Sequence, residues 1–179
     1  CRCWFSLLYF GHDEKKIHIL NGGLKKWIFE NKPITKGTTE IIESSYVANK
    51  KENLVVSLDQ IKKNILSNSF KVIDARSFER FEGKVSEPRT GLRSGHIQNS
   101  FCLPFNLCIN QKTGEFKNLE ELKELFNQRE NIEKRLDPVF TCGSGVTAAV
   151  LAYAYKMVNN DYIPKIYDGS WSEYGKYPA

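Results

Sequence analysis

The residue with the clearest potential for chemistry is Cys142, within the run PVFTCGSGVTAAVLAYAY at residues 138–155. A strand-like apolar segment precedes the thiol, and positions 143–147 separate it from an alanine-rich, helix-like segment. A side chain between a parallel strand and the following helix occupies the usual ligand position of an open α/β sheet. We expect backbone amides and the helix N-terminus to favour the thiolate, which is the nucleophilic form of cysteine.

The residues after Cys142 suit an anion-binding loop. Gly143 and Gly145 allow the main chain to approach the sulfur and to adopt positive φ angles. No bulky side chain follows the thiol for five positions, so amides alone could surround the sulfur; the residues concerned are Gly143, Ser144, Gly145, Val146 and Thr147. A buried structural cysteine before a helix of small residues would explain the same stretch, and this stretch leaves both interpretations open.

The elements around this loop alternate between strand and helix from residue 54 onwards. Strands are predicted at 70–75, 101–103, 139–141 and 165–167, and helices at 57–66, at 119–126, after Cys142 and from 169. This alternation predicts an α/β fold with a parallel sheet. Residues 76–100 have no regular period and are predicted to form one long loop, a kind of segment that is usually functional or mobile.

The front of the chain resembles the end of the same pattern. A helix is predicted at 4–10 ending at Gly11, a strand at 16–20, a turn and a helix at 24–29, and an extended linker at 31–43. YFGHDEKKIHILNGGLKKW and VNNDYIPKIYDGSWSEYG both run from a helix end through a strand and a glycine turn into a helix. The front segment therefore looks like the tail of a second copy, with chance similarity as the alternative.

Composition excludes several classes of function. The net charge is +5 over 179 residues, but no basic block alternates with aromatic residues, so nucleic-acid binding is not expected. No apolar run approaches the ~20 residues that a membrane span needs. The five cysteines form no C-x-x-C pair and the three histidines are scattered, which favours reduced thiols and gives no metal site. No cofactor is expected.

Three further motifs, in order, carry a family resemblance. VIDARSFERFEGKVSEPRTGLRSGHI, CGSGVTA and IYDGSWSEYG resemble the rhodanese superfamily, and most closely its 3-mercaptopyruvate sulfurtransferases. The likeness spans residues 54–175, and LNGGLKKW is similar to the N-terminal domain of the same family. It implies an α/β, rhodanese-like fold: an open, mainly parallel sheet with helices on both faces.

The resemblance also implies a division of the chain, because these enzymes carry two rhodanese domains and the second bears the catalytic cysteine. We expect residues 1–32 to be the C-terminal remnant of a truncated N-terminal domain, 33–48 to be the interdomain linker and 49–179 to be the catalytic domain. We further expect the apolar side chains of the remnant to lose their partners and to form an exposed patch; they are Trp4, Phe5, Leu8, Tyr9, Phe10 and Trp27.

By the same resemblance, Cys142 accepts sulfur from 3-mercaptopyruvate as a persulfide, and pyruvate leaves. A thiol such as reduced thioredoxin, or cyanide, then removes the sulfur. Arg80 and Arg89 match the family's two substrate-binding arginines, and a guanidinium can hold a carboxylate through two hydrogen bonds. Without the family, a pair of solvated surface arginines is the favoured explanation of these two residues.

Other residues receive roles by resemblance. The family's serine at the position of Ser144 helps proton transfer together with N-terminal-domain residues that have no match here, so a capping hydroxyl is the alternative. Asp74 and His96 are expected to hold loops through hydrogen bonds. Asp168 and Trp171 are expected to serve a turn and packing, and the compartment implied is the cytoplasm or the mitochondrion.

Three other functions are compatible with parts of this sequence. Thiosulfate sulfurtransferases of the same fold place two basic residues after the cysteine, whereas Gly143 and Ser144 are neutral, which favours mercaptopyruvate. The related phosphatases need C-x5-R, and position 148 is alanine, so this rival is rejected. An inactive rhodanese-like interaction module would usually lack Cys142, but the incomplete front keeps that alternative open.

Overall fold

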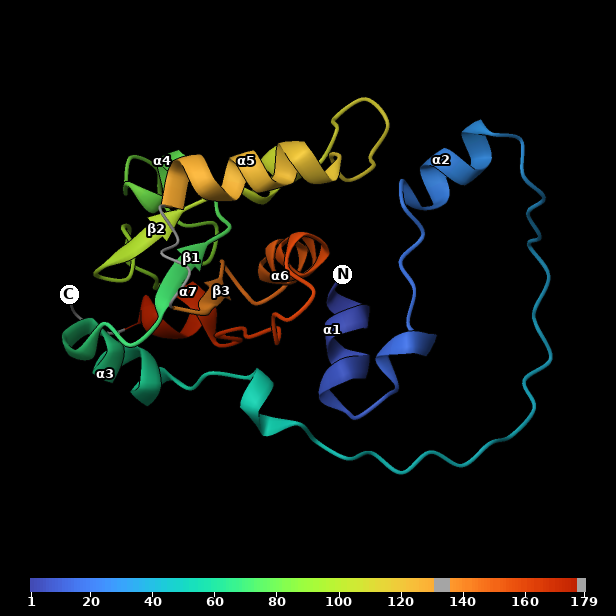
Figure 1. Ribbon diagram of the computed structural model, residues 1–179, viewed down its shortest axis with the longest axis horizontal. Helices are drawn as coiled ribbons and strands as arrows, with labels where there is room; N and C mark the ends of the chain where they lie inside the picture. The colour runs from blue at the N-terminus through green and yellow to red at the C-terminus, as the bar shows by residue number, and fades with distance from the viewer. Residues whose placement is uncertain (131–135, 177–179) are drawn as a thin grey trace.

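The sheet at the centre of the molecule is parallel. The computed structural model describes residues 1–130 and 136–176 (Figure 1). Strands β1 (Lys71–Asp74), β2 (Ser100–Cys102) and β3 (Pro138–Thr141) lie in the order β2–β1–β3. Ile166 extends the sheet beyond β3, because it forms parallel bridges with both Phe140 and Val55.

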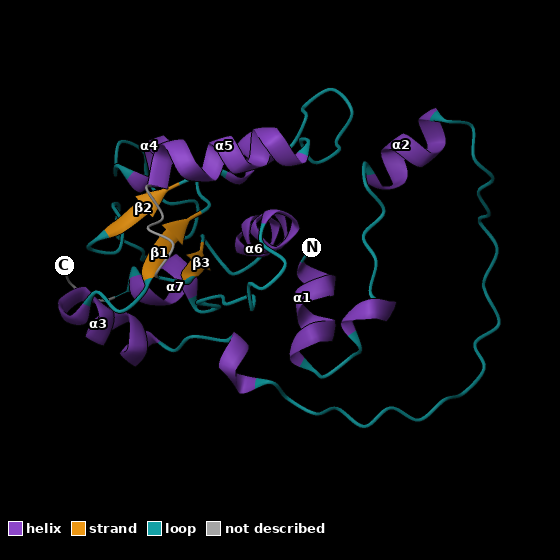
Figure 2. Cartoon of the chain, in the orientation of Figure 1, coloured by secondary structure: helices purple, strands orange, loops and turns teal. Residues whose placement is uncertain are grey.

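Seven α-helices and three short 3-10 turns within the described residues complete the fold (Figure 2). The α-helices are α1 (Arg2–Tyr9), α2 (Gly23–Phe29), α3 (Leu58–Ser67), α4 (Phe78–Phe81), α5 (Leu119–Glu130), α6 (Ala148–Val158) and α7 (Ser170–Tyr174). The 3-10 turns are Glu14–Lys16, Glu52–Leu54 and Phe105–Cys108. The predicted helices at 4–10, 24–29, 57–66 and 119–126 are therefore present, with ends that differ by a few residues.

Helices cover both faces of the sheet, as predicted. Side chains alternate along a strand, so Val72 and Val139 enter one apolar cluster while Ile73 and Phe140 enter the other. The first cluster also holds Ile61 of α3 and Trp171 of α7, and the second holds side chains of α1, α5 and α6. This two-sided burial places the carboxyl ends of the strands at one edge, where Cys142 follows β3.

Local signals explain why the helices begin and end where they do. Ser57 and Gln60 form a reciprocal capping box at the start of α3, which satisfies two backbone amides that the helix leaves free. Gly11 follows α1 with a φ of +91° and donates its amide to the Leu8 carbonyl, which is the predicted glycine stop.

Three local predictions need correction. The strand predicted at 16–20 is absent: Lys16 ends a 3-10 turn, and among the described residues no neighbouring strand pairs with 17–20. The predicted strand at 165–167 is reduced to the bridges of Ile166. The predicted loop at 76–100 contains the one-turn helix α4, whose start is capped by the Ser77 side chain.

The prediction of an unpartnered apolar patch at the front is wrong for three of its six members. Trp4, Phe5 and Leu8 are at most 4% exposed and belong to the same cluster as α6, and Trp4 packs edge-on against Tyr153 at 5.0 Å. An amphipathic helix buries its apolar face against whatever apolar surface is adjacent, and α6 provides that surface. The segment at 33–48 is exposed throughout and arcs outside the body in Figure 1.

Candidate active site

Cys142 lies where the strand–loop–helix pattern predicted. It directly follows β3, is 2% exposed, and is separated from α6 by residues 143–147. The backbone amide of Ser144 donates to the Cys142 Sγ atom at 3.4 Å. One backbone N–H group is thus directed at the sulfur, so the loop forms a partial anion cradle around the Cys142 side chain.

The orientation of these peptides is fixed by α7. The Trp171 and Ser172 amides donate to the carbonyls of Cys142 and Gly143, each at 2.9 Å. In a trans peptide the C=O and the following N–H point in opposite directions. Drawing the Gly143 carbonyl towards α7 therefore turns the Ser144 amide towards the sulfur.

Ser170 organises the loop from behind, and sequence reasoning missed it. Its side chain is fully buried, and its hydroxyl accepts hydrogen bonds from the amides of Cys142 at 3.3 Å and Gly145 at 3.0 Å. The same hydroxyl donates to the Tyr167 carbonyl at 2.9 Å. The Gly145 amide is thus occupied by Ser170, and Gly145 shapes the loop through its φ of +76°.

The structure brings Arg80 and Arg89 together beside the cysteine. A Cβ atom added at Gly143 would lie 3.0 Å from Arg80 Nη2 and 3.7 Å from Arg89 Nη1. Two guanidinium groups therefore lie next to the residue that follows the sulfur. They come from α4 and from the loop after it, which makes this segment one wall of the site.

A buried carboxylate holds Arg80 in place. Glu87, whose side chain is 1% exposed, accepts from Arg80 Nη2 at 2.5 Å and Nε at 3.2 Å. Arg76 Nη1 lies 2.8 Å from the same carboxylate, and Arg76 Nη2 lies 2.7 Å from Asp74. Alternating charges offset the cost of burying each one. Glu87 was not identified as a site residue in the sequence analysis. Its position two residues before Arg89, in SEPRTG, was a signal that could have done so.

The remaining sequence candidates have these positions. His96 Nδ1 lies 2.9 Å from the Phe81 carbonyl and its ring stacks on Phe81, so it holds the loop as expected. Asp168 forms an ion pair with Arg2. Val146 is 53% exposed, and Thr147 precedes α6 without a capping bond from its side chain.

The cysteines other than Cys142 are also free thiols. Cys108 is fully buried, and burial raises the pKa of its thiol to about 12. Across residues 1–130 and 136–176 there is no cluster of three or more metal-ligating side chains. Over the same ranges, no helix has the length and apolar character needed to cross a membrane.

Known proteins share this domain. A family model for the rhodanese-like domain matches residues 57–177, which include Cys142, both arginines and Glu87. The chain belongs to the rhodanese family. Human 3-mercaptopyruvate sulfurtransferase is 35% identical over 174 residues, covering 97% of this chain. Thiosulfate sulfurtransferase of Gallus gallus is 34% identical over the same length and share of this chain.

Rhodanese structures confirm the fold. The crystal structure of SseA from Escherichia coli, described as a 3-mercaptopyruvate sulfotransferase, matches with a TM-score of 0.81 and 33% identity, over 96% of this chain and 62% of that one. The chain spans 57% of the length of the human and Gallus gallus relatives. The predicted α/β rhodanese architecture and the resemblance drawn from the motifs are therefore confirmed.

Proposed function

We propose that this chain contains the catalytic domain of a sulfurtransferase that moves sulfur from 3-mercaptopyruvate to a thiol through a persulfide on Cys142. The observation that carries the proposal is the convergence on one loop of a cysteine at the end of β3 and two arginines beside Gly143. The donor would be a small anion, and neither a metal nor a cofactor enters the reaction.

In the first half-reaction the Cys142 thiolate attacks the sulfur atom of mercaptopyruvate. A sulfur–sulfur bond forms, the carbon–sulfur bond breaks, and its electron pair passes to carbon as the enolate of pyruvate. The enolate takes up the proton that the donor thiol loses, and pyruvate leaves. The Ser144 hydroxyl is our candidate for carrying that proton, since it lies two residues from the nucleophile.

The loop and the arginines have different tasks in this scheme. Arg80 and Arg89 hold the carboxylate and the ketone oxygen of the donor. The Ser144 amide, with those of Gly143, Val146 and Thr147, stabilises the anionic sulfur, while the positive φ of Gly145 allows the loop to curve. In the second half-reaction a thiolate attacks the outer sulfur, which leaves with it and restores the Cys142 thiolate.

Thiosulfate is the runner-up donor. The relatives include enzymes named for each donor, so similarity alone does not separate them. The neutral residues Gly143 and Ser144 support mercaptopyruvate, because a dianionic donor would gain most from cations directly after the cysteine. An inactive interaction module is less well supported, since the cradle around Cys142 is formed.

The domain division is part of the proposal. Residues 1–32 would be the end of an N-terminal rhodanese domain, 33–48 the linker and 49–179 the catalytic domain, and the exposed course of the linker supports this. We place the enzyme in the cytoplasm, with the mitochondrion as the alternative, and its acceptor as a dithiol protein of the thioredoxin kind.

Turnover tests the proposal. The chain is incubated with 3-mercaptopyruvate and dithiothreitol, or with thiosulfate and cyanide, and pyruvate, sulfide and thiocyanate are measured. We expect sulfide and pyruvate in equal amounts from the unmodified chain and from Cys102→Ser, and none above background from Cys142→Ser. Faster thiocyanate formation from thiosulfate would favour the runner-up, and equal rates in all three chains would contradict both.

A further inference from the structure

We infer that Arg2 is a positioning residue for the cysteine loop: it holds the Gly145 carbonyl and so fixes the orientation of the peptide between Gly145 and Val146 beside Cys142. The effect of Arg2 on the loop does not depend on the proposed function. Only the expected effect on sulfur transfer rests on it. It assigns a role at the site to a helix that lies outside the catalytic domain of the proposal.

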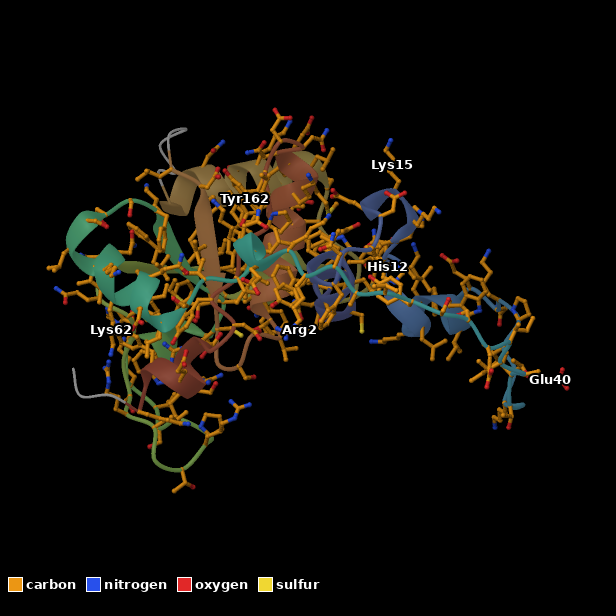
Figure 3. The ribbon with its side chains drawn as sticks, turned by 90° about the horizontal axis from the view of Figure 1, so that it is seen from below. Arg2, His12, Lys15, Glu40, Lys62 and Tyr162 are labelled. Carbon is orange, nitrogen blue, oxygen red and sulfur yellow. The ribbon has the colours of Figure 1, made fainter. Side chains whose placement is uncertain are left out.

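The contacts of Arg2 reach across the chain. Its Nη1 atom donates to the Gly145 carbonyl at 3.1 Å and pairs with Asp168, while Nη2 lies 3.2 Å from Asp168 Oδ2. Figure 3 labels Arg2 where the N-terminal helix meets the ribbon of the C-terminal part. One guanidinium thus joins α1, the cysteine loop and the turn before α7.

The bond to Gly145 adds a third held carbonyl to the same loop. The carbonyls of Cys142 and Gly143 accept amides of α7, and the Ser144 amide is directed at the sulfur. The Gly145 carbonyl accepts its hydrogen bond from the Arg2 side chain rather than from an amide of α7. Because C=O and N–H of one peptide point in opposite directions, the Val146 amide is turned to the side opposite Arg2.

Two features show that Arg2 is held in this position. Trp4, Phe5 and Leu8 bury the same helix against α6. A cation in the first turn of a helix opposes the helix dipole, so Arg2 needs a partner such as Asp168. The hydrogen bond to Asp168 raises the pKa of Arg2, and the negative charge of an ionised Cys142 adds to that rise.

The charged groups around the loop come from three sides. Arg2 approaches from α1, Asp168 from the turn before α7, and Arg80 and Arg89 lie over Gly143. Among these groups Arg2 is the one bonded to a loop carbonyl in the contacts of the described residues. Removing the Arg2 side chain should therefore change the reactivity of the Cys142 thiol, whereas removing the charge of Asp168 should not.

The test measures alkylation of Cys142 without any sulfur donor. The rate of modification by iodoacetamide is followed at the Cys142 peptide by mass spectrometry, across the pH range in which thiols ionise. Arg2→Ala is expected to lower the rate in the acidic part of the profile by about threefold to tenfold and to move the midpoint upwards. The matched control Lys15→Ala, which removes an exposed charge from the same segment, is expected to overlay the unmodified chain.

Two further variants distinguish a role of Arg2 in orienting the cysteine loop from a role in stabilising the fold alone. Arg2→Lys keeps a charged donor and should recover most of the alkylation rate of Cys142. If Arg2→Ala lowers the thermal midpoint of unfolding, Arg2→Lys is the variant that decides the test. Asp168→Asn removes the charge but keeps an amide oxygen that can accept from Arg2, so the Gly145 bond should persist and the alkylation midpoint should not move upwards. An Arg2→Ala profile that overlays the unmodified chain, an Arg2→Lys profile no better than that of Arg2→Ala, or an Asp168→Asn profile that copies Arg2→Ala would each overturn the inference.

The experiment remains informative if the proposed function fails. Alkylation needs no donor, so a chain that forms no persulfide would still reveal the effect of Arg2 on the thiol. If the proposed function holds, the same variants should lose persulfide formation in proportion to their loss of alkylation rate.

Discussion

Gly145→Ala should be among the most damaging single-methyl substitutions in the chain. Gly145 has a φ of +76°, a conformation that costs other residues about 1–2 kcal/mol. A Cβ atom there would overlap Asp168 Oδ1, and would lie 2.9 Å from Arg2 Nη1 and 3.0 Å from the Asp168 carbonyl oxygen. The ion pair and the Arg2–Gly145 bond must therefore separate, which adds about 1–2 kcal/mol at this half-exposed position.

Together these terms predict that the free energy of unfolding falls by about 3 kcal/mol, equivalent to a thermal midpoint lower by about 6–12 °C. The assay is thermal and urea unfolding followed by circular dichroism. Gly91→Ala is the matched control, because Gly91 has a φ of +82° but no atom within 4 Å of an added Cβ. It should report backbone strain alone, about 1–2 kcal/mol. If the two variants lose the same stability, the packing argument for Gly145 is refuted.

Gly143→Ala provides a contrast within the same loop. Its added Cβ would lie 3.0 Å from Arg80 Nη2, so the Arg80 guanidinium would shift slightly while keeping its bonds to Glu87, and stability should change little. We expect unfolding close to that of the unmodified chain but a KM for mercaptopyruvate raised about tenfold, because the arginines no longer hold the carboxylate. An unchanged KM would contradict the placement of the donor over Gly143.

Further predictions concern buried groups. Glu87→Gln should raise the KM for mercaptopyruvate by about tenfold, since Arg80 loses its charged partner, whereas the exposed control Glu82→Gln should not; steady-state kinetics distinguishes them. Ser170→Ala leaves two buried loop amides without an acceptor and should lower the free energy of unfolding by about 2 kcal/mol, measured in urea. The pKa of Cys108 is raised from 9.0 to about 12, so the folded chain keeps its proton while the unfolded chain loses it. Stability should therefore be unaffected by this group below pH 9 and then fall by up to about 1.4 kcal/mol per pH unit, a slope that Cys108→Ala should remove in urea titrations.

Much of the site could be predicted because its signals are local. The strand, the small residues and the helix around Cys142 are contiguous, and the hydrogen bond from Ser144 spans two residues. Arg80 and Arg89 lie in one segment of the sequence. Their predicted role in substrate binding came from the family match, because their spacing alone did not indicate it. The sheet followed from alternation of strand and helix, which parallel strands require.

What could not be predicted depends on contacts between distant segments. Ser170 meets the cysteine loop 28 residues away and Arg2 meets Gly145 143 residues away, and no sequence period marks either pair. The front helix was expected to lack partners because the resemblance makes residues 1–32 the remnant of a truncated domain. The sequence did not reveal that α6 of the same chain covers its apolar face. The strand expected at residues 16–20 failed for the related reason that a strand needs a neighbour.

The most direct test of the sulfurtransferase account is the mass of Cys142 after exposure to 3-mercaptopyruvate without an acceptor. Thiols and persulfides are trapped with an alkylating reagent, the chain is digested, and the masses of the cysteine peptides are measured by mass spectrometry. The account predicts one additional sulfur atom on Cys142, none on Cys102, and loss of that sulfur when dithiothreitol is added before trapping. An unmodified Cys142, or sulfur distributed equally among the exposed thiols, would contradict it.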